Sequence, residues 1–374
     1  MRIGILGGGQ LARMIMEDCY KFGFEFVILS KTASSPAGML TKDEIVGDWH
    51  DDETLHKFAD SCDIVTLENE FIDYQKIEYL ESLGKAVHPC SKIIKLIQDK
   101  LIQKQTLEDL GIPVADFVPV KTMEDITSFA GVHGYPVILK SRTMGYDGKG
   151  NYKIDSENDI DTALETIGAR GELMCESFVD FKIEIATQAA RSKSGEMKIY
   201  PVVETIQKDH ICHIVKASEK KFTEIKEQVN NIASTILEKL DYVGVMGIEM
   251  FLMEDNSILV NELAPRVHNT GHYSIEGCYT SQFENHIRAV LDLPLGDVTM
   301  REESAVMINI LGEKDAAAKL TRLGSALQNF RTYVHIYGKN ETRIGRKMGH
   351  ITVLDKYIDA AEKAAILCRN EIDI

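Results

Sequence analysis

Two glutamates in neighbouring predicted strands are the residues best placed to hold a divalent cation. Gly247–Met253 alternates apolar with other side chains and carries Glu249 as its one charge. Ile258–Leu263 is apolar apart from Asn261 and Glu262. The four residues between these segments are typical of a tight turn, so we expect a hairpin that brings Glu249 and Glu262 side by side. Two carboxylates about 4 Å apart repel by roughly 4 kcal/mol at an effective dielectric of about 20. Magnesium is the natural cation to offset this repulsion, because proteins hold it with one or two carboxylates plus substrate phosphates.

A group of hydrogen-bond donors follows the second strand directly. Arg266, His268 and Asn269 come immediately after Pro265. Donors of this kind can hold an anion and stabilise negative charge on it. A metal and phosphate site beside an anion site indicates an enzyme that phosphorylates a small anion.

A strand with a single lysine leads into a glycine-rich segment. Tyr135–Lys140 carries one charge, Lys140, and a lone inward lysine is costly unless it meets an anion. The following residues, 141–151, have three glycines in six positions, which lets backbone amides close over phosphates. No G-K-[ST] sequence precedes a helix here, so this is not a Walker loop. We expect a mobile flap with Lys140 reaching the phosphates; the alternative is an ordinary hairpin turn.

The densest basic cluster of the chain lies near its C-terminal end. Lys339, Arg343, Arg346 and Lys347 lie among glycines and before the predicted strand Ile351–Leu354. A rigid loop that presents Arg and Lys favours a phosphate monoester as its ligand. A solvated basic turn is the alternative, and it is the usual explanation of a run of like charges.

The N-terminal segment predicts the opening of a doubly wound parallel sheet. Arg2–Leu6 is a short apolar strand, and a glycine turn, a helix to about residue 23 and the strand Phe24–Leu29 follow it. A nicotinamide cofactor is disfavoured, because Ser30 and Lys31 stand where an acidic residue would hold the ribose. The glycine turn either serves the fold alone or binds a substrate phosphate at the helix N-terminus.

Two acids end the next buried strand. Glu68 and Glu70 follow Ile64–Leu67, and the carboxyl end of a parallel strand faces the ligand crevice. They could accept hydrogen bonds from an amine or a ribose. Solvation at a strand end explains them equally well.

The rest of the pattern indicates three domains, at 1–110, 111–299 and 300–374. We expect one long helix between Pro89 and Gly111, with Asp99 and Lys100 inside it, and a boundary directly after it. Further helices are predicted at Phe222–Leu240 and Ser281–Leu291, and strands at Leu173–Ser177, Ile199–Thr205, Ile211–Lys216, Met307–Leu311 and Tyr333–Tyr337.

Composition disfavours several classes of protein. The 374 residues include 42 Lys+Arg and 58 Asp+Glu, and this net charge of −16 disfavours nucleic acid and anionic membrane as partners. No run of about 18 apolar residues predicts a membrane span, and a strand at the very start is expected to leave no room for a signal peptide. The seven cysteines form no C-x-x-C pair and are expected to be reduced thiols in a cytoplasmic protein.

Taken together, these motifs resemble those of the ATP-grasp superfamily. The shared features are the strand lysine, the G-Y-D-G-K-G flap, the E-x-F-V segment and the carboxylates on two adjoining strands. More narrowly, the chain is similar to the N5-carboxyaminoimidazole ribonucleotide synthetase family of purine biosynthesis through the runs G-G-G-Q-L-A-R-M, N-E-L-A-P-R-V-H-N-T-G-H-Y, S-Q-F-E and R-K-M-G-H. The resemblance covers essentially the whole chain. It implies an α/β fold, α+β in the ATP-binding part, with a Rossmann-like domain, an ATP-grasp domain and a small β-rich C-terminal domain.

The resemblance implies an ATP-dependent carboxylation. ATP would phosphorylate bicarbonate to carboxyphosphate, and the amine of 5-aminoimidazole ribonucleotide would take the carboxyl group. The products would be N5-carboxyaminoimidazole ribonucleotide, ADP and phosphate. ATP is needed because bicarbonate is a poor electrophile, whereas its mixed anhydride with phosphate is a good one. By the same resemblance the protein would be a homodimer that passes its product to a separate mutase.

The resemblance also implies which residues bind ATP and metal. Glu249 and Glu262 would hold Mg²⁺. Adenine would border backbone groups of Glu176 and Val179, and the ribose would contact Glu184. The complete ATP site would comprise Lys100, Lys140, Gly145, Tyr146, Asp147, Gly148, Lys149, Gly150, Asn151, Glu176, Ser177, Phe178, Val179, Glu184, Gln207, Asn261 and Glu262.

The remaining candidates surround the other two substrates. Asp147 would contact the substrate amine, and bicarbonate would be held by Arg266, His268, Asn269 and Lys347. The ribonucleotide would be bound by Gln10, Glu68, Glu70, Lys339, Arg346 and Lys347, with the choice between Glu68 and Glu70 left open. Direct attack on carboxyphosphate and prior release of carbon dioxide both stay open.

Two positions depart from the family pattern. Ala12 stands where the family usually has Gly, and Gln207 stands where it has His. Gln can donate to a phosphate without charge, so little loss is expected there. Three other functions are weighed beside the carboxylation: an ATP-grasp ligase for another acid, a nucleotide-binding oxidoreductase, and a nucleotide sensor without catalysis.

Overall fold

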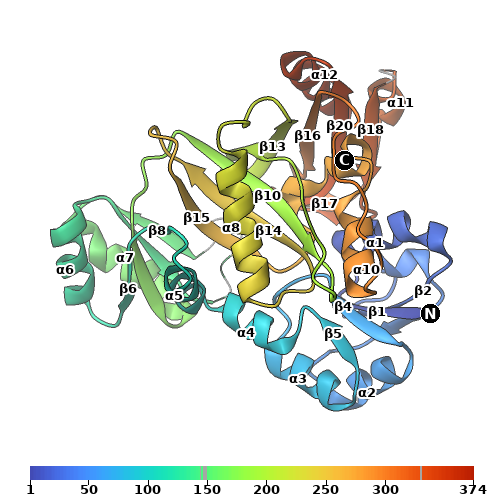
Figure 1. Cartoon of the computed structure of the whole chain (residues 1–374), viewed down its shortest axis with the longest axis horizontal. Coiled ribbons are helices and arrows are strands. Elements are labelled where there is room, and N and C mark those ends of the chain that lie inside the picture. The colour runs from blue at the N-terminus through green and yellow to red at the C-terminus, as the bar shows by residue number, and fades with distance from the viewer. Residues whose placement is uncertain (144, 146–149, 329–330) are drawn as a thin grey trace.

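The N-terminal part of the chain is a five-stranded parallel sheet (Figure 1). The computed structural model describes residues 1–143, 145, 150–328 and 331–374. The strand order is β3-β2-β1-β4-β5, with β1 (Arg2–Leu6), β2 (Glu25–Ser30), β3 (Glu44–Val46), β4 (Ile64–Leu67) and β5 (Ala86–His88). Ile3 and Ile5 pack with α1 (Gln10–Cys19) on one face, and Leu6 packs on the other with the helices α2 (Asp52–Asp60) and α3 (Tyr74–Ser82). The predicted doubly wound parallel sheet is confirmed.

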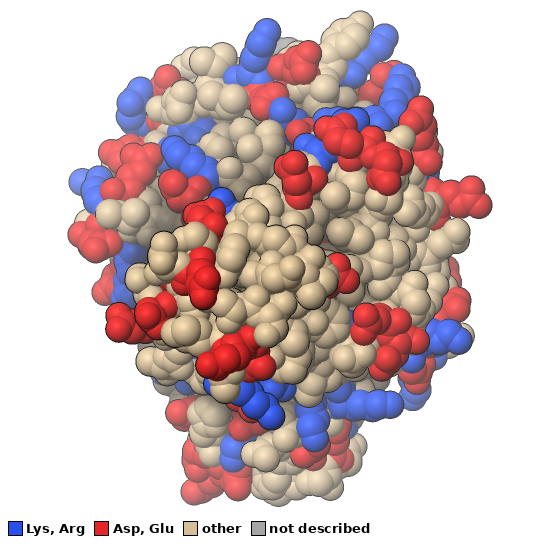
Figure 2. All heavy atoms as spheres, turned by 90° about the vertical axis from the view of Figure 1, so that its left-hand side faces the viewer, with Lys and Arg blue, Asp and Glu red and all other residues tan. Residues whose placement is uncertain are grey.

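A small antiparallel sheet forms one end of the molecule, at the left of Figure 1. Its order is β6-β9-β7-β8, and its elements are β6 (Phe117–Val120), β7 (Val137–Ser141), β8 (Asn151–Ile154), β9 (Leu173–Ser177), α6 (Met123–His133) and α7 (Ile160–Ile167). β7 and β8 pair with Lys140 opposite Asn151, so they bracket the glycine-rich segment. Figure 2 shows this end of the molecule, where uncharged residues cover the centre and charges of both signs lie around them.

A nine-stranded antiparallel sheet occupies the middle of the molecule and continues into the C-terminal part. Along its main path the strands are β15 (Ile258–Ala264), β14 (Gly244–Leu252), β10 (Ile183–Arg191), β12 (Val203–Lys208), β13 (Ile211–Ser218), β16 (Ser304–Leu311), β20 (Lys347–Asp355) and β18 (Thr332–Ile336). The ninth, β11 (Met197–Ile199), pairs with β10. Because β13 pairs with β16, the sheet crosses the division that we expect near residue 300.

Helices cover the large sheet through apolar stripes. α8 (Lys226–Lys239) contacts β10 and β11, and its side chains Val229, Ile232 and Ile236 belong to the same apolar cluster as Ile185 and Ala189 of β10. α10 (Gln282–Val290) packs on β14 and reaches α1 of the N-terminal sheet. The remaining elements are α9 (Ser274–Gly277), α11 (Leu323–Ala326), α12 (Ile358–Glu371), β17 (Ala316–Ala317) and β19 (Glu341–Thr342).

The single helix predicted between Pro89 and Gly111 is wrong, because the chain breaks at Asp99. Two helices stand there, α4 (Ser91–Gln98) and α5 (Lys100–Asp109). Asp99 has an extended backbone, and its carboxylate accepts a hydrogen bond from the Leu101 N–H at 3.0 Å. It therefore caps α5 and aims the first residue of that helix, Lys100, at the adjoining sheet.

The strand predicted at Ile199–Thr205 is also interrupted. β11 ends at Ile199 and β12 begins at Val203, with Pro201 between them. Proline has no N–H to give to a neighbouring strand, so the ladder stops there. Within the described ranges, no helix is long and apolar enough to cross a membrane.

Candidate active site

The two predicted metal-binding glutamates face each other across the β14–β15 hairpin. Glu249 pairs in register with Glu262, and a bulge follows directly after Glu249. Burial raises the pKa of Glu249 to about 7, and the nearby carboxylates of Glu262 and Glu184 add to the rise. In the part of the chain that is described, no group of three or more His, Cys, Asp or Glu could hold a metal. Mg²⁺ is typically bound by one or two carboxylates and takes its other ligands from phosphates and water. The pair Glu249 and Glu262 fits that requirement.

Lysines surround this carboxylate pair. Lys100 Nζ lies 2.7 Å from Glu262 Oε1, and Lys140 Nζ lies 2.6 Å from Glu176 Oε2. Burial opposes the charge on Lys100, but the Glu262 carboxylate outweighs it, so the pKa of Lys100 is raised. Positive charge therefore lies beside the glutamates, where the phosphates of a nucleotide would need it.

Lys104 is a further buried cation that sequence analysis missed. Its side chain is 3% exposed, and Nζ lies 3.3 Å from Glu176 Oε1. Burial lowers the pKa of Lys104 to about 8. The available signal was its position four residues after Lys100, on the same face of α5.

The other predicted ATP-site residues lie on the strands around this cluster. The Glu176 side chain is buried between Lys104 and Lys140, and its backbone lies within the β9 ladder, opposite Phe117 of β6 and Ile138 of β7. Ser177 and Val179 are half-buried, and Phe178 is exposed. Glu184 receives a hydrogen bond from the exposed Gln207 side chain, while burial raises the pKa of Glu184. Asn261 is half-buried beside Glu262.

A cavity of about 350 Å³ joins the N-terminal sheet to this cluster. Its lining includes Glu70, which follows β4 of the N-terminal sheet, together with Lys100, Gly145 and Glu262. Gly150, just before β8, has φ of +96°, a conformation that glycine adopts without strain. The Ser141 N–H donates a hydrogen bond to the Gly150 carbonyl at 2.8 Å. Of the predicted flap residues, Tyr146, Asp147, Gly148 and Lys149 lie outside the described residues.

Arg266 forms a two-bond ion pair with one of the two acids that we expect at the ribonucleotide. Its guanidinium donates Nη2–H to Glu70 Oε1 at 2.8 Å and Nε–H to Glu70 Oε2. The two side chains are 15% and 18% exposed. The structure thus joins a residue assigned to bicarbonate with a residue assigned to the ribonucleotide, although 196 positions separate them.

His268 and Asn269 lie next to the metal carboxylates. His268 Nε2 is 3.6 Å from Glu249 Oε1, and burial together with the charges of Arg266 and Lys347 holds the pKa of His268 well below its usual value. Lys347, at the start of β20, also lowers the pKa of Glu249, so its charge acts on this place. Asn269 exchanges two hydrogen bonds with Asn309 of β16, at 3.0 and 2.7 Å.

Of the residues assigned to the ribonucleotide, Gln10 and Glu68 lie at the N-terminal glycine turn, and the charge of Lys339 acts on Glu68. Glu68 is buried and accepts the Gly9 N–H at 2.9 Å, directly before Gln10. Burial raises the pKa of Glu68, and the positive charges of Lys339 and Arg266 oppose that rise. Lys339 Nζ donates to the Lys347 carbonyl at 2.6 Å. Arg346 donates to the Glu341 carbonyl at 2.7 Å, which directs it along its own loop.

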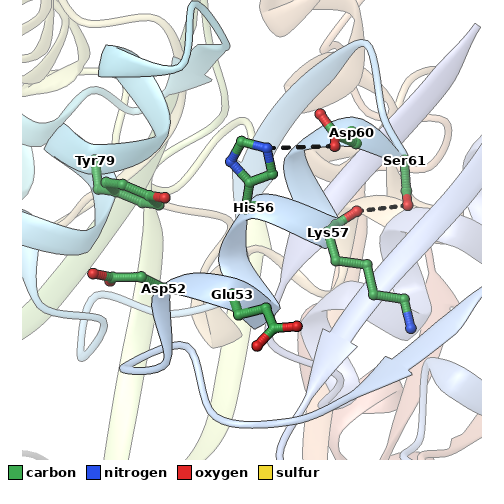
Figure 3. Close-up of a pocket in the computed structure, with 7 residues that line it drawn as sticks. All are labelled: Asp52, Glu53, His56, Lys57, Asp60, Ser61 and Tyr79. Atoms are coloured by element: carbon green, nitrogen blue, oxygen red, sulfur yellow. Dashed lines mark hydrogen bonds and ion pairs between the residues drawn. The ribbon is translucent and has the colours of Figure 1, made fainter.

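A second hollow lies on the outer surface of α2 and α3 (Figure 3). Its lining residues are Asp52, Glu53, His56, Lys57, Asp60, Ser61 and Tyr79, and His56 Nε2 lies 3.6 Å from Asp60. None of the candidate residues from the sequence lines it.

The fold and these side chains define the class of protein. A sequence profile described as the ATP-grasp domain matches residues 105–283. Profiles of the ribonucleotide synthetase preATP-grasp domain and of the phosphoribosylaminoimidazole carboxylase C-terminal domain match residues 1–98 and 305–364. The predicted ATP-grasp fold is confirmed.

Individual relatives narrow the class. The N5-carboxyaminoimidazole ribonucleotide synthase of Synechococcus elongatus is 37% identical, over 97% of this chain and 91% of its own. The phosphoribosylaminoimidazole carboxylase of Schizosaccharomyces pombe is 37% identical over 94% of this chain, but the match spans only 64% of that longer protein. The crystal structure of Aspergillus clavatus N5-carboxyaminoimidazole synthase with ADP and 5-aminoimidazole ribonucleotide has a TM-score of 0.89 at 34% identity, over 99% of this chain and 98% of that one. The chain belongs to the N5-carboxyaminoimidazole ribonucleotide synthase family.

Proposed function

We propose that this chain uses ATP to carboxylate the amine of 5-aminoimidazole ribonucleotide with bicarbonate, through carboxyphosphate. The observation that carries the proposal is that side chains assigned to the metal, to ATP and to bicarbonate lie close together. The facing carboxylates of Glu249 and Glu262 lie beside Lys100, and His268 lies 3.6 Å from Glu249. Lys347 acts on the same place from the C-terminal strands. The A. clavatus relative, crystallised with ADP and 5-aminoimidazole ribonucleotide, supports this choice of substrates.

In this proposal the nucleotide lies between the small sheet and the hairpin. Lys140 and Lys100 bind the phosphates, and the backbone at the end of β9 borders adenine. Glu249 and Glu262, with Asn261 beside them, hold Mg²⁺, which neutralises phosphate charge when bound. Phosphoryl transfer needs positioning and charge neutralisation more than covalent help from the protein, and these residues supply both.

The reacting anion lies where Arg266, His268, Asn269 and Lys347 meet. Hydrogen bonds from these groups stabilise charge that develops on carboxyphosphate. The ribonucleotide lies on the other side, with its phosphate toward Lys339 and its imidazole toward Glu68 or Glu70. Asp147 remains the candidate for contact with the substrate amine.

The decisive assay follows ADP formation with each substrate left out in turn. We expect turnover that requires both bicarbonate and 5-aminoimidazole ribonucleotide, with the carboxylated ribonucleotide as product. ADP formation at the full rate without the ribonucleotide, or with formate replacing bicarbonate, would refute the proposal. Arg266→Ala should raise the bicarbonate concentration needed for half-maximal rate while leaving ATP binding nearly intact.

Three finer statements belong to the same proposal. We infer a homodimer, a cytoplasmic location in keeping with seven cysteines that form no disulfide among the described residues, and transfer of the product to a separate mutase. Sedimentation of the purified chain tests the first. A coupled assay with an added mutase tests the last, because an unstable carbamate should be consumed faster than it decays.

A further inference from the structure

His268 is held by a set of buried polar side chains that the reaction as described does not use. Its backbone N–H donates to Gln282 Oε1 at 2.9 Å, and its carbonyl accepts from Gln282 Nε2 at 2.7 Å. A backbone N–H can only donate and a carbonyl can only accept, so the Gln282 amide has one possible orientation. Both backbone groups of His268 are thereby fixed to α10.

Glycines provide the space for this arrangement. A Cβ at Gly247 on β14 would lie 2.6 Å from His268 Cβ. A Cβ at Gly271 would lie 2.5 Å from Gln282 Oε1 and 2.7 Å from Gln188 Cδ. Both glycines have ordinary backbone angles, so close approach is what requires them here. The absence of a Cβ at Gly247 and at Gly271 therefore leaves space for His268, Gln188 and Gln282.

The ring of His268 is connected to a second amide through one hydroxyl. His268 Nδ1 lies 2.9 Å from Thr270 Oγ1, and Gln188 Nε2 donates to that same oxygen at 2.7 Å. Gln188, Thr270 and Gln282 are all fully buried. Thr270 accepts from Gln188, and among the described residues the other partner of its hydroxyl is Nδ1, so its single hydrogen is paired when it donates to Nδ1. An Nδ1 that accepts a hydrogen bond has no proton, so the ring proton is on Nε2.

The opposite orientation of the Gln188 amide is less favourable. As the amide stands, its Oε1 meets no hydrogen-bond partner among the described residues. Turning it over would leave both N–H groups of the amide without a partner among the described residues, whereas the present orientation leaves one N–H and the oxygen unpaired. Buried donors without a partner are rarer in proteins than under-satisfied oxygens, so the first orientation is the stable one.

We propose that Gln188 and Thr270 are positioning residues that hold His268 in the tautomer with its proton on Nε2. The ring then donates a hydrogen bond into the space beside Glu249, rather than accepting a proton there. In the proposed function, on which this step rests, the acceptor is an oxygen of bicarbonate or carboxyphosphate. A fixed donor stabilises charge that develops on that oxygen without the cost of turning the ring during the reaction.

The tautomer can be read without any assay of activity. The experiment is a long-range nitrogen–proton correlation spectrum of the full chain with nitrogen-15 histidine rings, with the His268 signal identified by its loss in His268→Asn. We expect a protonated Nε2 and a bare Nδ1. A protonated Nδ1 would overturn the proposal. His272 is an internal reference, because Gln282 Nε2 lies 3.1 Å from its Nδ1 and selects the same tautomer independently of Thr270.

Variants test whether the tautomer matters for turnover. Thr270→Val keeps the volume and removes the hydroxyl, so His268 should lose its single tautomer while His272 keeps its own. We expect kcat to fall roughly 10- to 100-fold with ATP affinity unchanged, the usual scale for losing a group that orients a functional side chain. Gln188→Met should act in the same direction, and Thr270→Ser, which keeps the hydroxyl, should restore most of the rate.

The matched control is Thr352→Val. Thr352 is fully buried on β20, and its hydroxyl finds no hydrogen-bond partner within the described ranges, so the same chemical change there should leave kcat and both histidines as they are. If Thr270→Val loses the Nε2 tautomer of His268 but keeps the kcat of the parent protein, the tautomer does not contribute to turnover and that part of the proposal is refuted. If the parent protein does not carboxylate the ribonucleotide, the proposed function fails, whereas the spectrum still decides the tautomer.

Discussion

The ion pair between Glu70 and Arg266 allows a quantitative prediction. Replacing Glu70 by Gln keeps the size of the side chain but leaves the Arg266 guanidinium in its buried position with a neutral partner. Removing one member of a fully buried ion pair costs about 3–5 kcal/mol. The two side chains here are 15% and 18% exposed, so water screens part of the charge. We expect Glu70→Gln to lower the free energy of unfolding by about 2–3 kcal/mol.

A surface ion pair joined by one hydrogen bond is the control. Arg322 and Glu371 lie 2.7 Å apart, but their side chains are 58% and 44% exposed. Glu371→Gln should cost about 0–1 kcal/mol, because solvent competes for both charges. The two substitutions change the same chemical group, so the difference between them measures the combined effect of burial and of the second hydrogen bond.

The assay is urea-induced unfolding followed by circular dichroism, for the parent, both variants, Arg266→Gln and the double variant Glu70→Gln/Arg266→Gln. The two single changes should each destabilise the protein, and the double change should cost clearly less than their sum. Equal costs for Glu70→Gln and Glu371→Gln would show that the reasoning from burial is mistaken. Additive costs for the double variant would show that the two side chains do not act as a pair.

Three further predictions concern the nucleotide and ribonucleotide sites. Glu262→Gln should lower kcat for ADP formation at least ~10²-fold, and near-normal turnover would argue against a metal role. The pKa of Lys104 is lowered to about 8 from 10.5, so the unfolded chain binds more protons between these pH values and stability should rise with pH there. The free energy of unfolding of Lys104→Met, measured by urea titration, should lack this rise of up to about 3 kcal/mol. Parallel pH profiles for the parent and Lys104→Met would contradict the lowered pKa of Lys104. Lys339→Ala should raise the ribonucleotide KM roughly 10- to 100-fold with little change for ATP, and an unchanged KM would remove Lys339 from that site.

The local pattern of the sequence was enough to predict the hairpin. Strand residues alternate between two faces and a tight turn joins the strands, so Glu249 and Glu262 could be expected close together, whereas the bulge after Glu249 that shifts the register by one residue could not be predicted. The observed register places them opposite each other. The parallel pairing of the first N-terminal strands followed in the same way from strand, glycine turn and helix, whereas the order of the five strands did not.

Contacts that depend on the folding of distant segments could not be predicted in this way. Arg266 and Glu70 could each be assigned to a substrate, but their ion pair joins residues 196 positions apart. Lys104 reads as an ordinary helix lysine until Glu176 is known to lie beside it. The break at Asp99 depends on capping of α5 and on Arg142, whose guanidinium donates to that carboxylate at 3.0 Å. In each case the deciding partner belongs to another element.

The continuous sheet has a consequence for how such a chain can be divided. β13 and β16 share a ladder of paired residues, from Ile214 opposite Ile308 to Ser218 opposite Ser304. A chain cut between them would expose an unpaired strand edge, which invites aggregation, and it would also separate Lys347 from Glu249. The C-terminal strands therefore cannot be exchanged between proteins as an independent module. Any recombination that preserves activity has to carry the whole sheet, from β10 to β20, as one inherited unit.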